Sequence, residues 1–501
     1  MPDQRPPRRI PLDVLESLRP RSVGDKGKEK CAVFGVWGSP EAVHQTYMAL
    51  YAQQHRGQES TGMAVSDGAR IHGHVGMGLA PEVYGRRVLA ELKAHGPSEG
   101  RTGGAIGHNR YSTSGGSESC NAQPLIERYV EGEVAVAHNG NLVNAEALRR
   151  VFGEAGHLFH TSSDTEVMIH LLAAPEQRAS SDPLAATLRR LQGAFSVVFL
   201  FPDRIEAARD PWGFRPLVLG EMDDGRAVVA SETVALDVIE ARFVREVEPG
   251  EIVTLSDAGV QSRTFAAPAE RSAMCVFEHV YFANPASQVF GQNVLAAREA
   301  MGEALAKEAP VEADYVMPMP DSGRSAANGY AHASGIPYRE GIVPNRYVGR
   351  TFIKPTQAER RSAVRLKLNV VGEIVDGKRL IVVDDSIVRG TTTREKMKQI
   401  RDAGAEEIHL RISCPPIRHP CYFGVDFATR EQLIAHGREV DQIRDYLGVD
   451  SLHFLSLEGL LGVMKHDSAS YCTACYSGDY RVDVEHPRTD QVLLKDQLGM
   501  F

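Results

Sequence analysis

The chain has 501 residues, of which 43% are hydrophobic and 24% are charged, and these are the proportions of an ordinary globular protein. They exclude collagen-like, coiled-coil and wholly disordered chains. The formal net charge is −9, from 56 Lys and Arg against 65 Asp and Glu, which argues against a general nucleic-acid-binding protein, because such a protein needs a basic face. A chain of this length has room for two or three domains.

The first 30 residues mix Pro, Arg, Lys, Asp and Glu with few aliphatic side chains, so we predict a flexible leader. They contain no apolar segment of the kind that a secretory signal needs. The longest apolar run, 194–201 (AFSVVFLF), is too short to span a membrane and indicates a buried strand. We therefore expect a cytoplasmic protein with no membrane partner, whose seven cysteines include a nucleophile or metal ligands rather than a disulfide framework.

The composition changes at Cys31, where a strand-like run (CAVFGVWG) is followed by a helical pattern that stops at Gly57. A helix is predicted at about 164–172, and short strands are predicted at 61–65, 105–108, 134–138, 195–201, 227–230 and 252–255. This pattern predicts an α+β domain over residues 31–260, in a layered αββα form with much antiparallel sheet.

Residues 261–470 show a different rhythm, in which strands and helices alternate. Helices are predicted at 292–307, 325–333 and 394–403, and strands at 315–318, 379–383 and 407–413. Such alternation predicts βαβ units and a parallel sheet, and therefore an α/β domain. Residues 471–501 form a C-terminal tail that carries a Cys-x-x-Cys pair.

Polar clusters in the first domain lie at predicted strand ends or in loops. They are Cys31, 55–60 (HRGQES), 107–113 (GHNRYST), 138–142 (HNGNL) and 162–166 (SSDTE). Each alone has a structural explanation, such as a buried cysteine, an Asn-Gly turn or an Asp N-cap. Together and in this order, they resemble the class II glutamine amidotransferases over roughly residues 31–260. The resemblance implies an N-terminal-nucleophile fold.

The resemblance implies that Cys31 is the nucleophile that attacks the side-chain amide of glutamine. Its own α-amino group would be the general base, with a pKa of about 7.7–8.0 in short peptides. In the sequence as given this nitrogen is joined to Lys30 in a peptide bond. The resemblance therefore also implies that the leader, residues 1–30, is removed before the glutaminase can act.

Six further residues receive roles from the same resemblance. Asn139 and the amide of Gly140 would form the oxyanion hole for the tetrahedral intermediate. Arg110 would hold the α-carboxylate of glutamine as a bidentate clamp, and Asp164 would pair with the α-ammonium group. Arg56 and Gly57 belong to the loop beside the nucleophile and are expected to contribute to glutamine binding.

A second constellation follows the predicted strand at 379–383, where the chain continues as DDSIVRGTTT (384–393) into a helix. Two adjacent carboxylates at the carboxyl end of a parallel strand can bind ribose hydroxyls or Mg²⁺. A glycine and three threonines at a helix N-terminus offer amides and hydroxyls to a phosphate. A Walker B-like strand or a plain capped helix is the alternative, but a Walker A motif is lacking.

This strand and loop resemble the phosphoribosyl pyrophosphate motif of the type I phosphoribosyltransferases, and the match covers about residues 275–470. It implies that Asp384 and Asp385 engage the ribose and Mg²⁺. Further phosphoribosyl pyrophosphate contacts would come from Ser386, Arg389, Gly390, Thr391, Thr392 and Thr393. Ser322, in the segment 320–323 (PDSG), would contact Mg²⁺ on the pyrophosphate side. Arg350 and Lys354 would belong to a flexible lid over residues 346–355 that excludes water.

A glutaminase followed by a phosphoribosyltransferase resembles the glutamine phosphoribosylpyrophosphate amidotransferase family. The implied reaction uses ammonia from glutamine to displace pyrophosphate from phosphoribosyl pyrophosphate, giving 5-phosphoribosylamine, pyrophosphate and glutamate at the first committed step of purine synthesis. The resemblance also implies inhibition by purine nucleotides and a homodimer or homotetramer. Two alternatives are another class II glutamine amidotransferase, or a phosphoribosyl pyrophosphate sensor that has lost catalysis.

The remaining cysteines suggest a metal centre. Cys472 and Cys475 can chelate one centre, and two more cysteines could complete a zinc or iron–sulfur site. Spacing alone leaves both open. The sequences around Cys275 and Cys421 resemble the members of the family that carry a [4Fe–4S] cluster, which implies that these four cysteines are its ligands. Cys414 is an alternative to Cys421, and the role of the cluster would be structural or oxygen-sensing.

Overall fold

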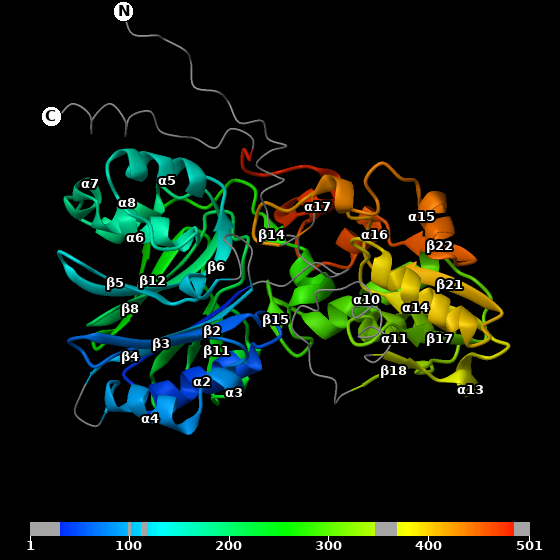
Figure 1. The fold of residues 1–501 in the computed structure, drawn as a ribbon, viewed down its shortest axis with the longest axis horizontal. Helices are drawn as coiled ribbons and strands as arrows, with labels where there is room; N and C mark the ends of the chain where they lie inside the picture. Colours follow the sequence, from blue (N-terminus) through cyan, green and yellow to red (C-terminus); the bar gives the residue numbers. More distant parts are fainter. Residues whose placement is uncertain are drawn as a thin grey trace, which may run out of the picture.

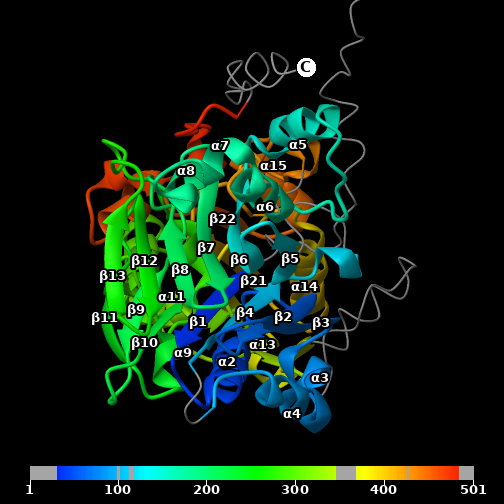
Figure 2. The same cartoon turned by 90° about the vertical axis from the view of Figure 1, so that its left-hand side faces the viewer.

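The computed structural model describes residues 31–98, 102–111, 118–345, 368–425, 427 and 429–484. Its first half contains two antiparallel sheets that face each other (Figures 1 and 2). The seven-stranded sheet has the order β11 (Arg242–Glu246), β9 (Val218–Glu221), β10 (Ala227–Ala230), β1 (Ala32–Trp37), β4 (Gly104–Arg110), β2 (Ser60–Ser66) and β3 (Ile71–Met77). The six-stranded sheet has the order β13 (Gly259–Thr264), β12 (Glu251–Ser256), β8 (Arg204–Arg209), β7 (Gly193–Phe201), β6 (Gly132–Leu142) and β5 (Leu125–Tyr129).

Helices cover the outer face of each sheet, as Figure 2 shows. Those beside the seven-stranded sheet are α2 (Ala42–Ala52), α3 (Ala80–Val83), α4 (Arg86–Ala94) and α9 (Val234–Asp237). Those beside the six-stranded sheet are α5 (Ala145–Glu154), α6 (Thr165–Ala173), α7 (Pro175–Arg178) and α8 (Pro183–Leu188), and η1 (Ser119–Asn121) is a short 3₁₀ turn. The predicted αββα layering is confirmed.

Burial on both faces explains why the central strands are apolar throughout rather than alternating. Every residue of β1 and of β7 is buried. Val33 of β1, Ile106 of β4, Ala135 of β6 and Val198 of β7 pack in the core between the two sheets. The other faces of the same strands pack against the outer helices. A strand in such a position needs apolar side chains on both sides.

The second half is built on a four-stranded parallel sheet, and the prediction of βαβ units is confirmed. The order is β17 (Tyr315–Pro318), β20 (Arg379–Asp384), β21 (Glu407–Ile412) and β22 (Ser451–Phe454). The surrounding elements are α10 (Val294–Glu308), α11 (Arg324–Ser334), α13 (Gly372–Val375), α14 (Thr391–Asp402), η3 (Arg430–Gln432), α15 (Val440–Leu447), α16 (Leu457–Gly462) and the hairpin of β18 (Ile342–Pro344) and β19 (Leu368–Val370).

Short elements lie where the two halves meet, in the middle of Figure 1. They are β14 (Met274–Cys275), the π-helical turn η2 (Glu278–Phe282), the hairpin of β15 (Gln288–Val289) and β16 (Gln292–Asn293), η4 (Ser468–Ser470), β23 (Tyr471–Cys472) and α17 (Ala474–Ser477). β14 and β23 pair in parallel, so the C-terminal segment returns to the point where the second half of the chain begins.

Local chemistry explains where two helices depart from the predicted boundaries. The helix predicted from 292 begins at Val294, because the side chain of Asn293 caps it by accepting a hydrogen bond from the amide of Ala296 at 3.0 Å. The helix predicted from 394 begins at Thr391, directly after Gly390, whose φ of +77° ends the preceding loop. In the described part of the chain, no helix is both long and apolar enough to cross a membrane.

Candidate active sites

Cys31 lies directly before β1, at the edge of the space between the two sheets. The register of Ala32 with Asn109 places it beside Arg110, the last residue of β4. Cys31 is only 6% exposed, and its thiol lies 3.8 Å from the carbonyl oxygen of Tyr111. Burial raises the pKa of this thiol to about 11, although the contact with Tyr111 and the charge of Arg110 oppose the shift. The thiol is therefore protonated at neutral pH and needs a base to become a nucleophile.

A buried cation and a buried anion accompany this thiol. Nη1 of Arg110 donates to Oε1 of Glu59 at 2.7 Å, and Arg110 and Asp164 both influence the pKa of Cys31. Asp164 occupies the N-cap position of α6 but makes no capping hydrogen bond. Its Oδ2 instead accepts the amide of Leu142 at 2.9 Å. Asp164 therefore takes the predicted N-cap position without capping the helix through its side chain. The pair of opposite charges suits the zwitterionic end of an amino acid.

The charge of Asp164 is well supported. Burial alone would raise the pKa of this carboxyl, but His138, the amide of Leu142 and Arg110 outweigh it and lower the pKa below its usual value. Nδ1 of His138 lies 3.6 Å from Oδ1 of Asp164. Asp164 is thus ionised at neutral pH.

Asn139 and Gly140 lie inside strand β6, opposite Ser196 and Phe195 of β7, so the alternative of an Asn-Gly turn is wrong. Asn139 is fully buried, yet neither its Oδ1 nor its Nδ2 has a hydrogen-bond partner among the described residues. A buried amide without a partner is costly and points to a missing ligand. Gly140 has no room for a side chain, because a Cβ atom there would lie 1.9 Å from the carbonyl oxygen of Ala194.

Arg56 is held by protein groups on several sides. Its Nε donates to the carbonyl oxygen of Cys31 at 3.2 Å, and Nη1 and Nη2 donate to the two carboxylate oxygens of Glu278 at 3.1 and 3.0 Å. Nη1 also pairs with Glu232 at 2.5 Å. Burial opposes the charge of Arg56, but Glu278 and Glu232 raise its pKa. The guanidinium therefore faces the backbone of Cys31 and the two carboxylates.

The neighbouring Gly57 packs directly on strand β4. A Cβ atom at this position would lie 2.6 Å from the carbonyl carbon of Asn109 and 2.8 Å from the amide nitrogen of Arg110. Only glycine allows the loop to approach this closely. Gly57 thereby fixes the loop of Arg56 against the strand that carries Arg110.

Asp384 is the last residue of β20, and Asp385 follows it, both almost fully buried at 2% and 1% exposure. The amide of Asp385 donates to Oδ1 of Asp384 at 3.0 Å, and the hydroxyl of Ser386 donates to Oδ2 of Asp385 at 2.5 Å. Gly390 immediately precedes α14, and a Cβ atom there would lie 2.3 Å from Cδ1 of Ile434. The predicted loop thus connects a parallel strand to a helix N-terminus, where Thr391, Thr392 and Thr393 form the first turn.

The loop of Ser322 lies at the same edge of the parallel sheet. β17 and β20 are neighbours, with Pro318 opposite Val383. A Cβ atom at Gly323 would lie 2.3 Å from the carbonyl oxygen of Val383, so the two loops are packed against each other. Nε of Arg389 donates to Oε1 of Gln432 at 3.2 Å. Arg350 and Lys354 lie outside the described residues, as does the leader.

Sequence reasoning missed Arg298, because it lies within an ordinary helical pattern. Its Nε donates to the carbonyl oxygen of His279 at 2.7 Å and Nη2 donates to that of Ala283 at 2.9 Å. Burial lowers the pKa of Arg298 to about 10, and the charge of Asp385 opposes this shift. Arg298 therefore holds the π-helical turn η2 and carries a positive charge that interacts with Asp385.

The four cysteines named as cluster ligands gather where the two halves meet. Cys275 of β14 lies opposite Cys472 of β23. Burial raises the pKa of Cys475 well above its usual value, and Cys421, Cys472 and Cys275 add to the shift. Cys414 also raises the pKa of Cys475, but less than the other three cysteines do, and its Sγ lies 3.3 Å from the carbonyl oxygen of Pro415. None of the seven cysteines, all of which lie in described segments, forms a disulfide.

Within the described ranges, no three His, Cys, Asp or Glu side chains are close enough together to hold a single metal ion.

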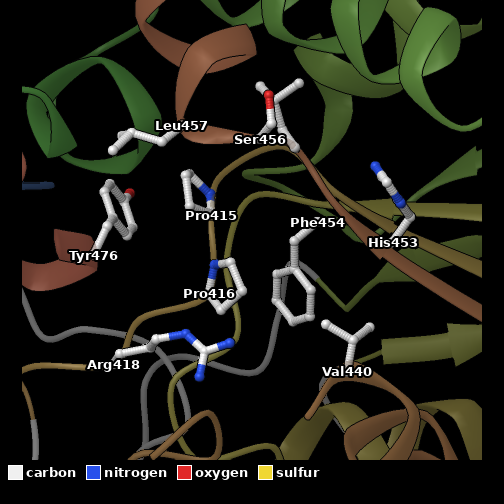
Figure 3. A pocket seen from close by; sticks show the side chains of 10 residues that line it. Pro415, Pro416, Arg418, Val440, His453, Phe454, Ser456, Leu457 and Tyr476 are labelled. Carbon is white, nitrogen blue, oxygen red and sulfur yellow. The ribbon is translucent and has the colours of Figure 1, made fainter.

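A separate cavity of about 330 Å³ lies beside the ends of β21 and β22, and Pro415, Arg418, Phe454 and Tyr476 are among the residues that line it (Figure 3). None of the predicted site residues lines this cavity.

Comparisons with known proteins show the family to which the chain belongs. A family model described as "Glutamine amidotransferase domain" matches residues 108–238. The amidophosphoribosyltransferase of Bacillus subtilis is 47% identical over 461 residues, covering 91% of this chain and 95% of the relative. The chain belongs to the amidophosphoribosyltransferase family. The chloroplastic amidophosphoribosyltransferase 1 of Arabidopsis thaliana is likewise 47% identical, over 91% of this chain and 80% of its own.

Solved structures of this family match the whole architecture. The glutamine phosphoribosylpyrophosphate amidotransferase of B. subtilis, complexed with ADP and GMP, has a TM-score of 0.83 at 45% identity and covers 92% of this chain and 99% of its own. An amidophosphoribosyltransferase is a glutamine-dependent transferase at the first step of purine synthesis, so that is the activity of this chain. Because the match spans both halves, a different class II amidotransferase and a catalytically silent sensor are both disfavoured.

Proposed function

We propose that glutamine is hydrolysed at Cys31, with Arg110 and Asp164 holding its α-carboxylate and α-ammonium groups. The observation that carries this assignment is the buried side chain of Asn139, which has no hydrogen-bond partner in the part of the chain that the structure describes and lies on the strand that ends beside Asp164. Nδ2 of Asn139 and the amide of Gly140 would donate to the oxygen of the tetrahedral intermediate, where negative charge develops. Without a ligand, Asn139 bears the full desolvation penalty of an unmade hydrogen bond.

The proton of the Cys31 thiol needs an acceptor, since burial raises the pKa of the thiol to about 11. The α-amino group of Cys31 would accept it, then return it to the leaving ammonia. An amide nitrogen cannot do this, so the leader must be cleaved after Lys30. Arg56 would position the new terminus by holding the carbonyl oxygen of Cys31 at 3.2 Å, and we assign it this role in place of glutamine binding.

We propose that phosphoribosyl pyrophosphate binds at the carboxyl edge of the parallel sheet. Asp384 and Asp385 would orient the ribose, and the phosphate would lie on the amides and hydroxyls from Ser386 to Thr393, at the N-terminus of α14. The donor set of two buried carboxylates beside the Ser322 loop fits Mg²⁺, which would neutralise the pyrophosphate as it leaves. Arg350 and Lys354 remain proposed lid residues.

We further propose that Cys275, Cys421, Cys472 and Cys475 hold a [4Fe–4S] cluster. The donor chemistry fits, because four thiols from three chain segments share one buried region and raise one another's pKa. Bound as thiolates, they would join β14, β23 and the segment around residue 421. The reaction transfers no electrons, so the role of these residues would be structural or oxygen-sensing.

Several broader properties belong to the same proposal. We keep the division into a leader (1–30), a glutaminase domain (31–260), a phosphoribosyltransferase domain (261–470) and a tail (471–501). The B. subtilis relative was solved with ADP and GMP, which supports purine nucleotides as inhibitors. We also propose a homodimer or homotetramer in the cytoplasm, where thiols stay reduced.

The test of the proposed function compares two nitrogen donors. Pyrophosphate release from phosphoribosyl pyrophosphate is measured with glutamine and with ammonia, on protein that begins at Cys31. We expect release with both donors and glutamate formation only with glutamine. Release with ammonia alone would reject the glutaminase assignment, and release with neither would reject the transferase site.

A further inference from the structure

A segment from the second half of the chain, Tyr422–Phe423–Gly424, lies directly against β6, the strand that carries Asn139 and Gly140. Nδ2 of Asn141 donates to the carbonyl oxygen of Tyr422 at 2.9 Å. A Cβ atom at Gly424 would lie 3.0 Å from both the carbonyl carbon and the oxygen of Gly140. The two backbones therefore touch at the residue whose amide is proposed to bind the oxyanion.

This segment is itself held firmly. A guanidinium nitrogen of Arg215, which is fully buried, donates to the carbonyl oxygen of Phe423. The ring of Phe423 is 2% exposed and stacks on Phe214 with the ring centroids 4.3 Å apart. The carbonyl oxygen of Arg215 accepts the hydroxyl of Ser196, the residue opposite Asn139. These contacts thus hold both the 422–424 segment and the pair of strands β6 and β7, of which β6 carries Asn139 and Gly140.

Gly424 is the point where a side chain cannot be tolerated. Its φ is +99°, a conformation that favours glycine. A Cβ atom would also lie 2.9 Å from a guanidinium nitrogen of Arg215. An added methyl group would therefore push against Gly140 on one side and Arg215 on the other.

We propose that Gly424 is a positioning residue for glutamine hydrolysis, because the 422–424 segment sets the backbone of Gly140 from outside the glutaminase domain. The inference rests on the proposed function, since it assumes that Gly140 binds the oxyanion. It makes the second half of the chain a structural part of the first active site. Oxyanion binding acts on the transition state, so kcat should respond rather than the binding of glutamine.

The test uses Gly424→Ala in full enzyme that begins at Cys31, with Gly437→Ala as the control. Gly437 also has a positive φ, +66°, but a Cβ atom there meets nothing within 4 Å. We expect Gly424→Ala to lower kcat with glutamine about tenfold or more, by analogy with the loss of an oxyanion donor. KM for glutamine, ammonia-dependent activity and iron content should stay at the wild-type values, and the control should change none of these.

A covalent probe separates positioning from general damage. The diazo ketone analogue of glutamine presents a carbonyl oxygen to the oxyanion residues, and its diazo carbon takes the thiol proton and forms a bond to sulfur as N₂ leaves. Inactivation by this probe should slow in parallel with kcat, whereas alkylation of Cys31 by iodoacetamide should not change. Asn141→Ala, which removes only the contact with Tyr422, should reproduce the effect in weaker form.

Two outcomes would overturn the proposal. Equal kcat values for Gly424→Ala and wild type would show that the segment does not set Gly140. Parallel losses of glutamine- and ammonia-dependent activity would show a general folding defect, particularly if Asn141→Ala kept full activity. A wild-type enzyme that cannot use glutamine would instead reject the proposed function itself.

Discussion

Arg56 and Glu278 form a bidentate ion pair, with both nitrogen–oxygen distances near 3 Å (3.0 and 3.1 Å) and neither side chain exposed. Arg56 lies in the loop beside Cys31, and Glu278 lies in the π-helical turn after β14. Arg215 contacts the same carboxylate at 3.5 Å. The pair joins the backbone of Cys31 to the second half of the chain, without exposure to solvent.

Breaking this pair should be costly. Glu278→Gln should lower the free energy of unfolding by about 3 kcal/mol, because it removes one of the two carboxylates that compensate the buried charge of Arg56, and that carboxylate also contacts the buried Arg215. The urea unfolding midpoint measures this. The control is Glu91→Gln, which breaks an exposed pair with Arg87 and should leave the midpoint close to the wild-type value. Equal effects from the two variants would contradict the structural importance of the buried pair.

The two activities should separate at Cys31. Cys31→Ala should abolish glutamine-dependent synthesis of phosphoribosylamine and leave ammonia-dependent synthesis intact, because Asp384 and Asp385 lie at the edge of the parallel sheet in the second half of the chain. The measurement is pyrophosphate release with each donor. A folded Cys31→Ala protein that lost both activities would contradict the two-site arrangement.

The carboxylates of the transferase site should be required for both activities. Asp384→Asn with Asp385→Asn should remove synthesis with glutamine and with ammonia, since the ribose and Mg²⁺ are no longer positioned. The matched control is Asp402→Asn, at the exposed end of α14, whose only described partner is Lys398. Normal synthesis by the double variant would show that the motif has been misassigned.

The leader should determine how the Cys31 thiol responds to pH. The pKa of the thiol, about 11 in the leader-bearing chain, lies above the usual value, so the thiolate is scarce below that pH and its fraction rises about tenfold per unit. Alkylation of Cys31 by iodoacetamide should therefore keep rising from pH 7 to pH 10. A Cys120→Ser background removes the exposed thiol.

After cleavage at Lys30, glutamine hydrolysis should instead level off near pH 8, because the α-amino group has become the base. Sequencing of the active protein should give Cys31 as its first residue. Full glutaminase activity in protein whose terminus is still Met1 would contradict this role of the leader.

The proposed cluster ligands, Cys275, Cys421, Cys472 and Cys475, lead us to expect a defined iron content. Anaerobically purified protein should be brown and contain about four irons and four sulfides per chain. Cys421→Ser should lose the colour and lower the unfolding midpoint, since cluster binding contributes to folding, whereas Cys414→Ser should keep both. The reverse result would exchange the two cysteines as ligands, and a colourless, fully active protein would reject the cluster.

The sequence by itself determined the order of the two candidate sites along the chain and most of the local structure. Strand β17 is found with its predicted bounds, and β7 and β20 lie within a residue or two of theirs, because apolar runs between turn residues suffice to define buried strands. The motifs around Cys31 and Asp384 are visible because their polar side chains lie at strand ends, where no core packing requires them, whereas Asn139 lies inside β6.

Only the tertiary structure decided what these residues touch. Asp164 follows the pattern of a helix cap, but its carboxylate accepts a hydrogen bond from the amide of Leu142 at the end of β6 instead. The ion pair of Arg56 with Glu278 and the contact of Gly424 with Gly140 leave no signal in the sequence, since an ion pair across 222 residues and a contact between two backbones depend on how the halves pack. Sequence patterns report the local environment of a residue, whereas a site built from distant segments exists only once the loops between them are closed.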